Sequence, residues 1–319
     1  MKKEFTFPSS DGRTQIHAVR WTNPEISPVG IVQLIHGMVE YIDRYEEFAE
    51  YLADQGYIVV GHDHLGHGKS VCTEDDYGFF ADDHPAIVLM QDIHRLRMGT
   101  SARYPELPYY MLGHSMGSYI LRRYLASQGE GLAGAIIMGT GQVPDVATSA
   151  GLALIKAEAK KNGWRYRSEK VEKLTFGGAY KQFDLTGEDP SRSWLSKNEE
   201  NVREYYRNPL SGFRFTLNGY YVLLSTVRFD NQKKNVAAIP KDLPILIVSG
   251  EDDPVGDMGK GVKKVYQSFV KAGIRDVSCN LFPGDRHEIL NETDRNEVYA
   301  YILDWLKEHH SKEPEEETI

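Results

Sequence analysis

The sequence predicts an α/β protein with a doubly wound, mostly parallel sheet. Short apolar runs of strand length recur along the chain, and stretches with helical spacing separate them. The run at residues 30–35 is apolar except for Gln33, which is typical of a strand buried on both faces. Strands that alternate with helices favour parallel pairing, because the helix carries the chain back across the sheet.

The predicted elements follow one another in a regular order. Residues 2–7 and 14–21 alternate between polar and apolar and predict an antiparallel hairpin closed by a Ser-Ser-Asp-Gly turn. Further strands are predicted at residues 30–35, 57–61, 109–112, 132–139, 243–250 and 276–282. Helices are predicted at residues 44–55, 83–104, 259–273 and 295–310, and in the segment after residue 117.

One long interval interrupts this alternation. Residues 141–238 contain no clear buried strand but much helical and aromatic sequence. An insertion of this length between core strands covers the carboxyl-terminal edge of the sheet, where ligands bind in such folds. We therefore expect a core of residues 1–140 and 239–310, a cap of residues 141–238, and an acidic flexible tail of residues 311–319. Most cap aromatics should fill the cap's own core, and a few should line a pocket.

The composition argues against several classes of partner. A net charge of −9 disfavours nucleic acid or an anionic membrane surface as the main partner. The two cysteines, Cys72 and Cys279, fit neither a disulfide framework nor a CxxC metal site, which favours a reducing, cytoplasmic compartment. No apolar run approaches 18 residues, so we expect no transmembrane segment and at most transient contact with a membrane surface.

The clearest local signal is Gly113-His114-Ser115-Met116-Gly117, a G-x-S-x-G sequence between a predicted strand and a predicted helix. Cβ atoms at the two glycines would collide with the neighbouring strand and helix in so tight a turn. The turn presents the Ser115 hydroxyl at a helix N-terminus, where the helix dipole favours developing negative charge. This context predicts a nucleophilic serine.

A serine hydroxyl needs a base to take its proton, and the base needs a group to orient it. His287 follows the last predicted strand and Asp253 follows the strand before it, on the same side of the sheet as Ser115. We expect His287 to be the general base and later the general acid. Asp253 should hold the imidazole tautomer and stabilise the imidazolium. Asp252 is an open alternative to Asp253, and Asp145 is a third.

The tetrahedral intermediate of acyl transfer carries an oxyanion, which requires preorganised N–H donors. The backbone N–H of Met116, directly after the serine, should supply one donor. Met38 should supply the other, because it lies in the loop after the strand at residues 30–35 and Gly37 allows that backbone to approach closely.

A second histidine-rich motif runs from His62 through His64 to His67. Its H-x-H-x-x-H spacing is typical of binuclear zinc hydrolases, and histidines so spaced after a strand can bind metal. That motif requires an aspartate where Gly66 stands, and no second set of ligands follows downstream. We therefore expect no metal and no cofactor.

These motifs resemble those of the α/β-hydrolase superfamily, and within it the monoacylglycerol lipase and lysophospholipase-like group, also classified with serine aminopeptidases. The similarity covers nearly the whole chain, including HGMVEYIDRYEEFAEYLADQGYIVVGHDHLGHGKS, GHSMGS, WLSKNEENVREYYRNPLSGFRFT, GEDDPVG and RHEILNE. The resemblance implies the α/β-hydrolase fold, a triad of Ser115, Asp253 and His287, and Met38 and Met116 as oxyanion donors.

The leading functional hypothesis is a serine carboxylic-ester hydrolase that works through an acyl-enzyme on a lipid-like ester, such as a monoacylglycerol or lysophospholipid. The alternative is an aminopeptidase or amidase that uses the same triad. That enzyme would need cap carboxylates to hold the substrate amine, and the candidates are Glu158, Glu169, Glu172, Glu199 and Glu204. A non-enzymatic receptor on this fold is disfavoured, because such proteins commonly lack triad members.

Overall fold

The computed structural model describes residues 1–310, so the expected acidic tail lies outside the described residues. Within residues 1–310 eight strands form one sheet in the order β1-β2-β4-β3-β5-β6-β7-β8. The strands are β1 (Lys2–Pro8), β2 (Gln15–Trp21), β3 (Gly30–Ile35), β4 (Tyr57–His62), β5 (Tyr109–His114), β6 (Gly134–Met138), β7 (Ile245–Gly250) and β8 (Val277–Phe282). The β1–β2 and β2–β4 pairs are antiparallel and all other pairs are parallel, which confirms the predicted fold class.

Helices cover both faces of this sheet, and further helices lie within residues 141–238. They are α1 (Glu46–Ala53), α2 (Pro85–Arg103), α3 (Met116–Gln128), α4 (Asp145–Asn162), α5 (Glu169–Thr175), α6 (Glu199–Arg207), α7 (Leu217–Asp230), α8 (Lys233–Val236), α9 (Lys260–Lys271) and α10 (Arg295–Glu308). None of those helices is both long and apolar enough to cross a lipid bilayer.

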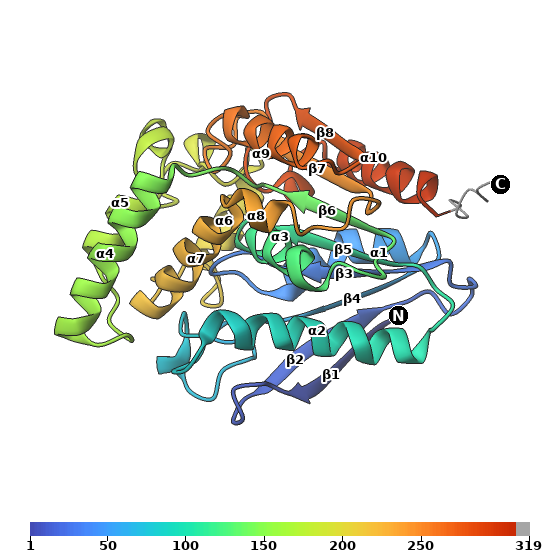
Figure 1. Cartoon of the computed structure of the whole chain (residues 1–319), viewed down its shortest axis with the longest axis horizontal. Coiled ribbons are helices and arrows are strands. Elements are labelled where there is room, and N and C mark those ends of the chain that lie inside the picture. Colours follow the sequence, from blue (N-terminus) through green and yellow to red (C-terminus); the bar gives the residue numbers. More distant parts are fainter. Residues whose placement is uncertain (311–319) are drawn as a thin grey trace.

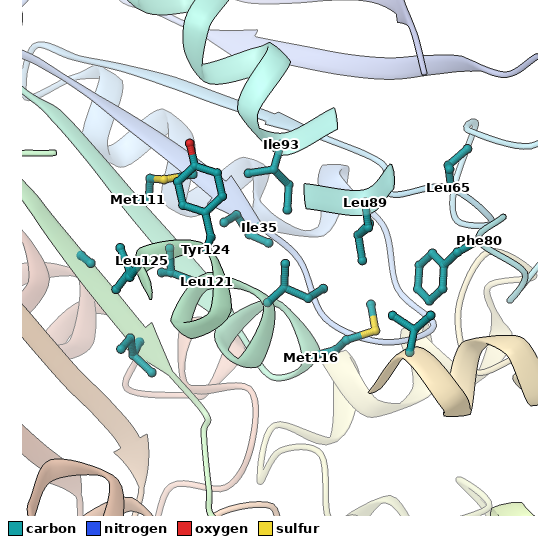
Figure 2. Packing of buried hydrophobic residues seen from close by; sticks show 14 of the residues in the cluster. Ile35, Leu65, Phe80, Leu89, Ile93, Met111, Met116, Leu121, Tyr124 and Leu125 are labelled. Atoms are coloured by element: carbon teal, nitrogen blue, oxygen red, sulfur yellow. The ribbon is translucent and has the colours of Figure 1, made fainter. Parts of the chain in front are cut away.

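Alternate residues of the central strands pack into two separate cores. Ile31 and Ile35 of β3 belong to the core that also contains apolar side chains of α2, α3 and α9. Val32 and Leu34 belong to the core on the other face, which contains side chains of α1 and α10. Figure 2 shows the first core between α2, α3 and the sheet. Burial on both faces explains why these strands are mainly apolar in the sequence.

Residues 141–238 contain helices α4 to α8 and no strand of the sheet. In Figure 1 these helices lie beyond the edge toward which the arrowheads of β6 and β8 point. Helix α4 packs closely on α7, and a Cβ atom at Gly151 would overlap the side chain of Leu224. Helix α7 in turn contacts α3, which follows the serine turn. Residues 141–238 therefore pack against α3, the helix that begins directly after Ser115.

Two helix starts differ from the predicted boundaries. The predicted helix at residues 44–55 is a 3₁₀ turn, Ile42–Tyr45, followed by α1. The predicted helix at residues 83–104 begins two residues later, with Pro85 at its first position. Proline is favoured there because its fixed φ suits a helix and its missing N–H has no partner in the first turn.

Candidate active site

Ser115 lies on a strained turn between the end of β5 and the start of α3. Its backbone has φ 55° and ψ −121°, a conformation that costs energy for a residue with a side chain. A Cβ atom at Gly113 would overlap the backbone of Gly117, and one at Gly117 would overlap the carbonyl oxygens of Ile35 and His36. Both glycines therefore have the steric role that the sequence predicts.

The loops after β7 and β8 bring Asp253 and His287 into contact. Nδ1 of His287 lies 3.0 Å from Oδ2 of Asp253, and both side chains are buried. The same Oδ2 accepts a hydrogen bond from the Ser249 hydroxyl at 3.1 Å, and Oδ1 accepts one from the Val255 N–H at 2.8 Å. These bonds fix the carboxylate so that one oxygen faces the imidazole.

The other two predicted carboxylates lie elsewhere. Asp252 is half-buried, and its N–H donates to the carbonyl of Asp285. Asp145 is exposed at the start of α4, where it accepts a hydrogen bond from Asn231 at 2.9 Å. The geometry therefore favours Asp253 as the partner of His287.

Both predicted oxyanion donors lie beside the serine. Met116 is the first residue of α3, so its N–H has no acceptor within the helix. Met38 is half-buried in the loop after β3, and the next residue, Val39, has a positive φ of 51°. Met38, Met116, Ser115 and His287 all line one cavity.

This cavity has a volume of about 570 Å³ and extends from the serine into the cap. Most of its wall is apolar, and helices α4, α5 and α7 contribute Ala147, Gly151, Ile155, Val171, Leu174 and Leu224 to it. Four cap aromatics also line it: Phe176, Tyr180, Trp194 and Tyr205. Its charged lining consists of Glu40, Asp257, Lys264 and Glu288.

Two rings that the sequence analysis did not single out contact His287. The Trp194 ring lies 5.1 Å from the His287 ring, and the His114 ring lies 4.7 Å from it, measured between centroids. The interplanar angles are 31° and 37°. His114 directly precedes the serine, whereas Trp194 comes from the cap, so the His287 ring touches both the core and the cap.

A buried polar network behind the site was also missed. Glu40 accepts hydrogen bonds from the Gly37 N–H at 2.5 Å and the Tyr45 hydroxyl at 2.8 Å, and it contacts His114. Arg44 binds both Glu40 and Glu288. Burial disfavours the charged form of Glu40, but the hydrogen bond to His114 and the charges of His114 and Arg44 outweigh it and hold the Glu40 pKa below its usual range.

The Arg44 guanidinium also reaches the cap. Its Nη2 lies 3.0 Å from Oδ1 of Asn201 in α6, and Asn201 donates to Glu288 at 2.8 Å. Glu288 is the residue after His287. The Glu40–Arg44 spacing of four residues in the sequence is the signal that could have suggested an ion pair, but nothing in it indicates burial.

The motif His62-Asp63-His64-Leu65-Gly66-His67 lies behind the oxyanion loop rather than in the cavity. The rings of His62, His64 and His67 are fully buried and lie near the ring of His36 or of one another. Across residues 1–310, no group of three or more His, Cys, Asp or Glu side chains is arranged so that it could hold a metal ion.

Comparisons with known proteins agree with this geometry. The family model for serine aminopeptidase, S33, matches residues 26–294. The chain is 27% identical to a monoacylglycerol lipase of Mycolicibacterium smegmatis, and the match covers 97% of this chain and 98% of that protein. It is 25% identical to an uncharacterized abhydrolase domain-containing protein of Dictyostelium discoideum, over 90% of this chain but only 27% of that protein.

A solved structure, that of a highly thermostable carboxyl esterase from Bacillus coagulans in complex with glycerol, superposes with a TM-score of 0.88. The two chains are 30% identical, and the match covers 97% of this chain and 99% of the esterase. Since the family model spans most of the chain and the fold and relatives agree with it, the protein belongs to the serine aminopeptidase, S33, family of α/β-hydrolases and is a serine ester hydrolase.

Proposed function

We propose that this protein hydrolyses a lipid-like carboxylic ester, such as a monoacylglycerol or a lysophospholipid, through an acyl-enzyme. The observation that carries the proposal is the cavity of about 570 Å³ that contains Ser115 and His287 and continues between apolar side chains of the cap. Ligand pockets that bury most of a small apolar molecule have this volume and character. The relatives named as a monoacylglycerol lipase and a carboxyl esterase support the same substrate class.

The proposed reaction begins when Oγ of Ser115 attacks the ester carbonyl carbon and His287 takes the hydroxyl proton. Asp253 accepts the Nδ1–H of His287 and stabilises the imidazolium that forms. The backbone N–H groups of Met38 and Met116 donate to the oxyanion. The intermediate collapses when His287 protonates the leaving alcohol, and water then attacks the acyl-enzyme with His287 again acting as base.

Residues 141–238 serve as the cap, or lid, in this proposal, and they bind the acyl chain. Three apolar residues at the start of α4 and the end of α5 support transient contact with a lipid surface. Val146 is 83% exposed, and Val143 and Leu174, which also line the cavity, are 37% and 57% exposed. Apolar side chains exposed at the opening of a lipid site offer a surface to the aggregate that supplies the substrate.

The aminopeptidase alternative receives no support from the cap carboxylates. None of Glu158, Glu169, Glu172, Glu199 and Glu204 lines the cavity. Four of them pair with cations instead, as in Glu172 with Arg214 at 2.6 Å and Glu199 with Arg203 at 2.5 Å. Glu40 and Glu288 face the cavity, but both are ion-paired with Arg44. Among the described residues that line the cavity, Asp257 is the carboxylate that Arg44 does not bind.

The proposal is tested by hydrolysis of p-nitrophenyl esters of rising chain length, run beside aminoacyl-anilides. We expect turnover of esters with a preference for medium or long chains, followed by turnover of monoacylglycerol or lysophospholipid. Ser115→Ala should lower kcat by roughly 10⁵-fold or more, as deletion of a triad serine does elsewhere.

The matched control is Ser118→Ala, one turn along α3, whose hydroxyl donates to the carbonyl of Ser115 rather than facing the cavity. It should lower kcat far less than Ser115→Ala. Cleavage of anilides with little preference for esters would support the aminopeptidase alternative instead. Full turnover by Ser115→Ala would refute Ser115 as the nucleophile.

A further inference from the structure

We propose that His114 is a positioning residue that carries a proton on both ring nitrogens and holds His287 from the core side of the site. The proposal deepens the proposed function, because it rests on His287 being the general base. It concerns the buried cluster of Glu40, Tyr45 and His114, which is less than 6% exposed at each residue.

The hydrogen bonds of this cluster leave both His114 nitrogens as donors. Nε2 lies 3.2 Å from the main-chain carbonyl oxygen of His287, and a carbonyl can only accept, so Nε2 carries a proton. Nδ1 lies 2.9 Å from the Tyr45 oxygen and 3.2 Å from Oε1 of Glu40. The Tyr45 hydroxyl donates to Oε1 of Glu40 at 2.8 Å. Oε1 of the ionised Glu40 can only accept, so its contact with Nδ1 requires a proton on Nδ1.

The charges around His114 favour this doubly protonated form. Glu40 lies beside it from the loop after β3, and Glu288 adds negative charge from the loop after β8. The Arg44 guanidinium binds both carboxylates and is the cation of the same network. Tyr45, His287 and the more distant His36 are further titratable groups near His114. Burial alone would lower the His114 pKa, but the hydrogen bond and charge of Glu40 outweigh burial and raise it.

An imidazolium at this place has two effects on His287. Its Nε2–H holds the His287 main-chain carbonyl, which fixes the loop that carries the base. Its positive charge lies under the His287 ring, with 4.7 Å between centroids, so removing it changes the electrostatic field at the base. The same Glu40 binds the Gly37 N–H of the oxyanion loop, so one ion pair positions both the base and the loop beside Met38.

The first test is the pH profile of kcat/KM for His114→Gln. Glutamine removes the positive charge and leaves Glu40 in place, so we expect the midpoint of the acid limb to move upward by about one pH unit. Activity at pH 5.5 should then fall about tenfold more than activity at pH 8.5. The double variant with Glu40→Gln should bring the midpoint back toward the wild-type value, because it also removes the negative charge of Glu40.

The matched control is His94→Gln. His94 is a half-buried histidine that is also bonded to a tyrosine, since its Nδ1 lies 2.8 Å from the Tyr124 hydroxyl, but it lies in α2 away from the cavity. Its variant should leave the midpoint in place. A role of His114 in packing alone would lower kcat/KM equally at all pH values, so an unmoved midpoint in His114→Gln overturns the proposal.

A second test needs neither activity nor a folded His114 variant. Nitrogen NMR of ¹⁵N-histidine-labelled wild-type protein reports the protonation of each ring, and His114 can be assigned through its contact with the Tyr45 ring. We expect His114 to be doubly protonated at pH 7, where a free imidazole is mostly neutral, and to become singly protonated in Glu40→Gln. A singly protonated His114 at pH 7 in the wild type overturns the proposal. If the protein fails to hydrolyse esters, the proposed function is refuted, but the NMR result for the protonation of His114 still stands.

Discussion

Asp253 and Asp252 are adjacent carboxylates in different surroundings, and this difference yields a prediction at the scale of one residue. Asp253 is fully buried and accepts from His287, Ser249 and Val255, whereas Asp252 is half-buried and does not contact His287. Asp253→Asn should lower kcat by roughly 10⁴-fold, because an amide cannot accept the Nδ1–H in the same way and favours the wrong imidazole tautomer.

Asp252→Asn is the control for this prediction and should change kcat by no more than about threefold, as a substitution outside the contact does. Both variants are compared by steady-state ester hydrolysis after their melting temperatures are shown to match. Equal losses in the two variants would mean that the carboxylate next to His287 does not orient it.

The candidate site divides into residues that the sequence predicted and residues that it did not. Ser115, Asp253 and His287 were predicted because each follows a recognisable strand, and strand ends meet at one edge of a parallel sheet. Trp194 and His114 were not predicted as site residues, because their contact with His287 depends on how residues 141–238 and the serine turn fold. A periodic pattern reports which face of an element is apolar, but it does not report which distant side chains meet.

At the scale of elements, the close contact between α3 and β3 predicts an unequal response of two helical glycines. Gly117 in α3 lies against the backbone carbonyls of Ile35 and His36, which cannot move out of the way of a Cβ atom. Gly99 in α2 has open space on its side-chain face, and a Cβ atom added there would meet no other atom within 4 Å. Gly117→Ala should therefore lose several kcal/mol of unfolding free energy, or fail to fold.

Gly99→Ala is the matched control, because it makes the same substitution inside a helix with open space. It should gain about 0.5–1 kcal/mol, the difference in helix propensity between the two residues. Urea denaturation followed by circular dichroism measures both. A Gly117→Ala variant as stable as the wild type would show that α3 can shift away from β3 without loss.

Element boundaries were predicted unevenly. Strand β3 has the predicted bounds, whereas β6 and β7 each begin two residues later than predicted although all of their residues are buried. The helix near residue 44 was misjudged because Arg44 and Tyr45 fit helical spacing, yet in the structure they end a 3₁₀ turn. Arg44 is held there by Glu40 and Glu288, contacts that come from outside the segment.

At the scale of the whole molecule, four buried histidines link stability to pH. Burial lowers the pKa of His36 and His64, and it lowers the pKa of His62 and His67 to about 3. In the unfolded chain a histidine has a pKa of about 6.5. Below that pH the unfolded chain protonates these four rings, whereas the folded protein keeps them neutral. Their contribution to stability is fully present above pH 6.5 and is lost as the pH falls toward 3.

His62 allows this contribution to be isolated. Neither of its ring nitrogens has a hydrogen-bond partner among the described residues, and its ring packs against Phe7 with 5.8 Å between centroids. His62→Phe removes the group that can be protonated, and the cost of fitting its larger ring into the buried site does not depend on pH. The substitution should therefore remove the decrease in unfolding free energy that His62 causes below pH 6.5, which is about 1.4 kcal/mol per pH unit.

The measurement is urea denaturation of the wild type and His62→Phe at pH 7.5 and at pH 5.0. The difference in unfolding free energy between them should grow by about 2 kcal/mol at the lower pH, in favour of the variant. His84→Asn, which alters an exposed histidine at the start of α2, should show no such growth. A constant difference for His62→Phe would mean that His62 takes up its proton in the folded protein as readily as in the unfolded chain, and that acid sensitivity arises elsewhere.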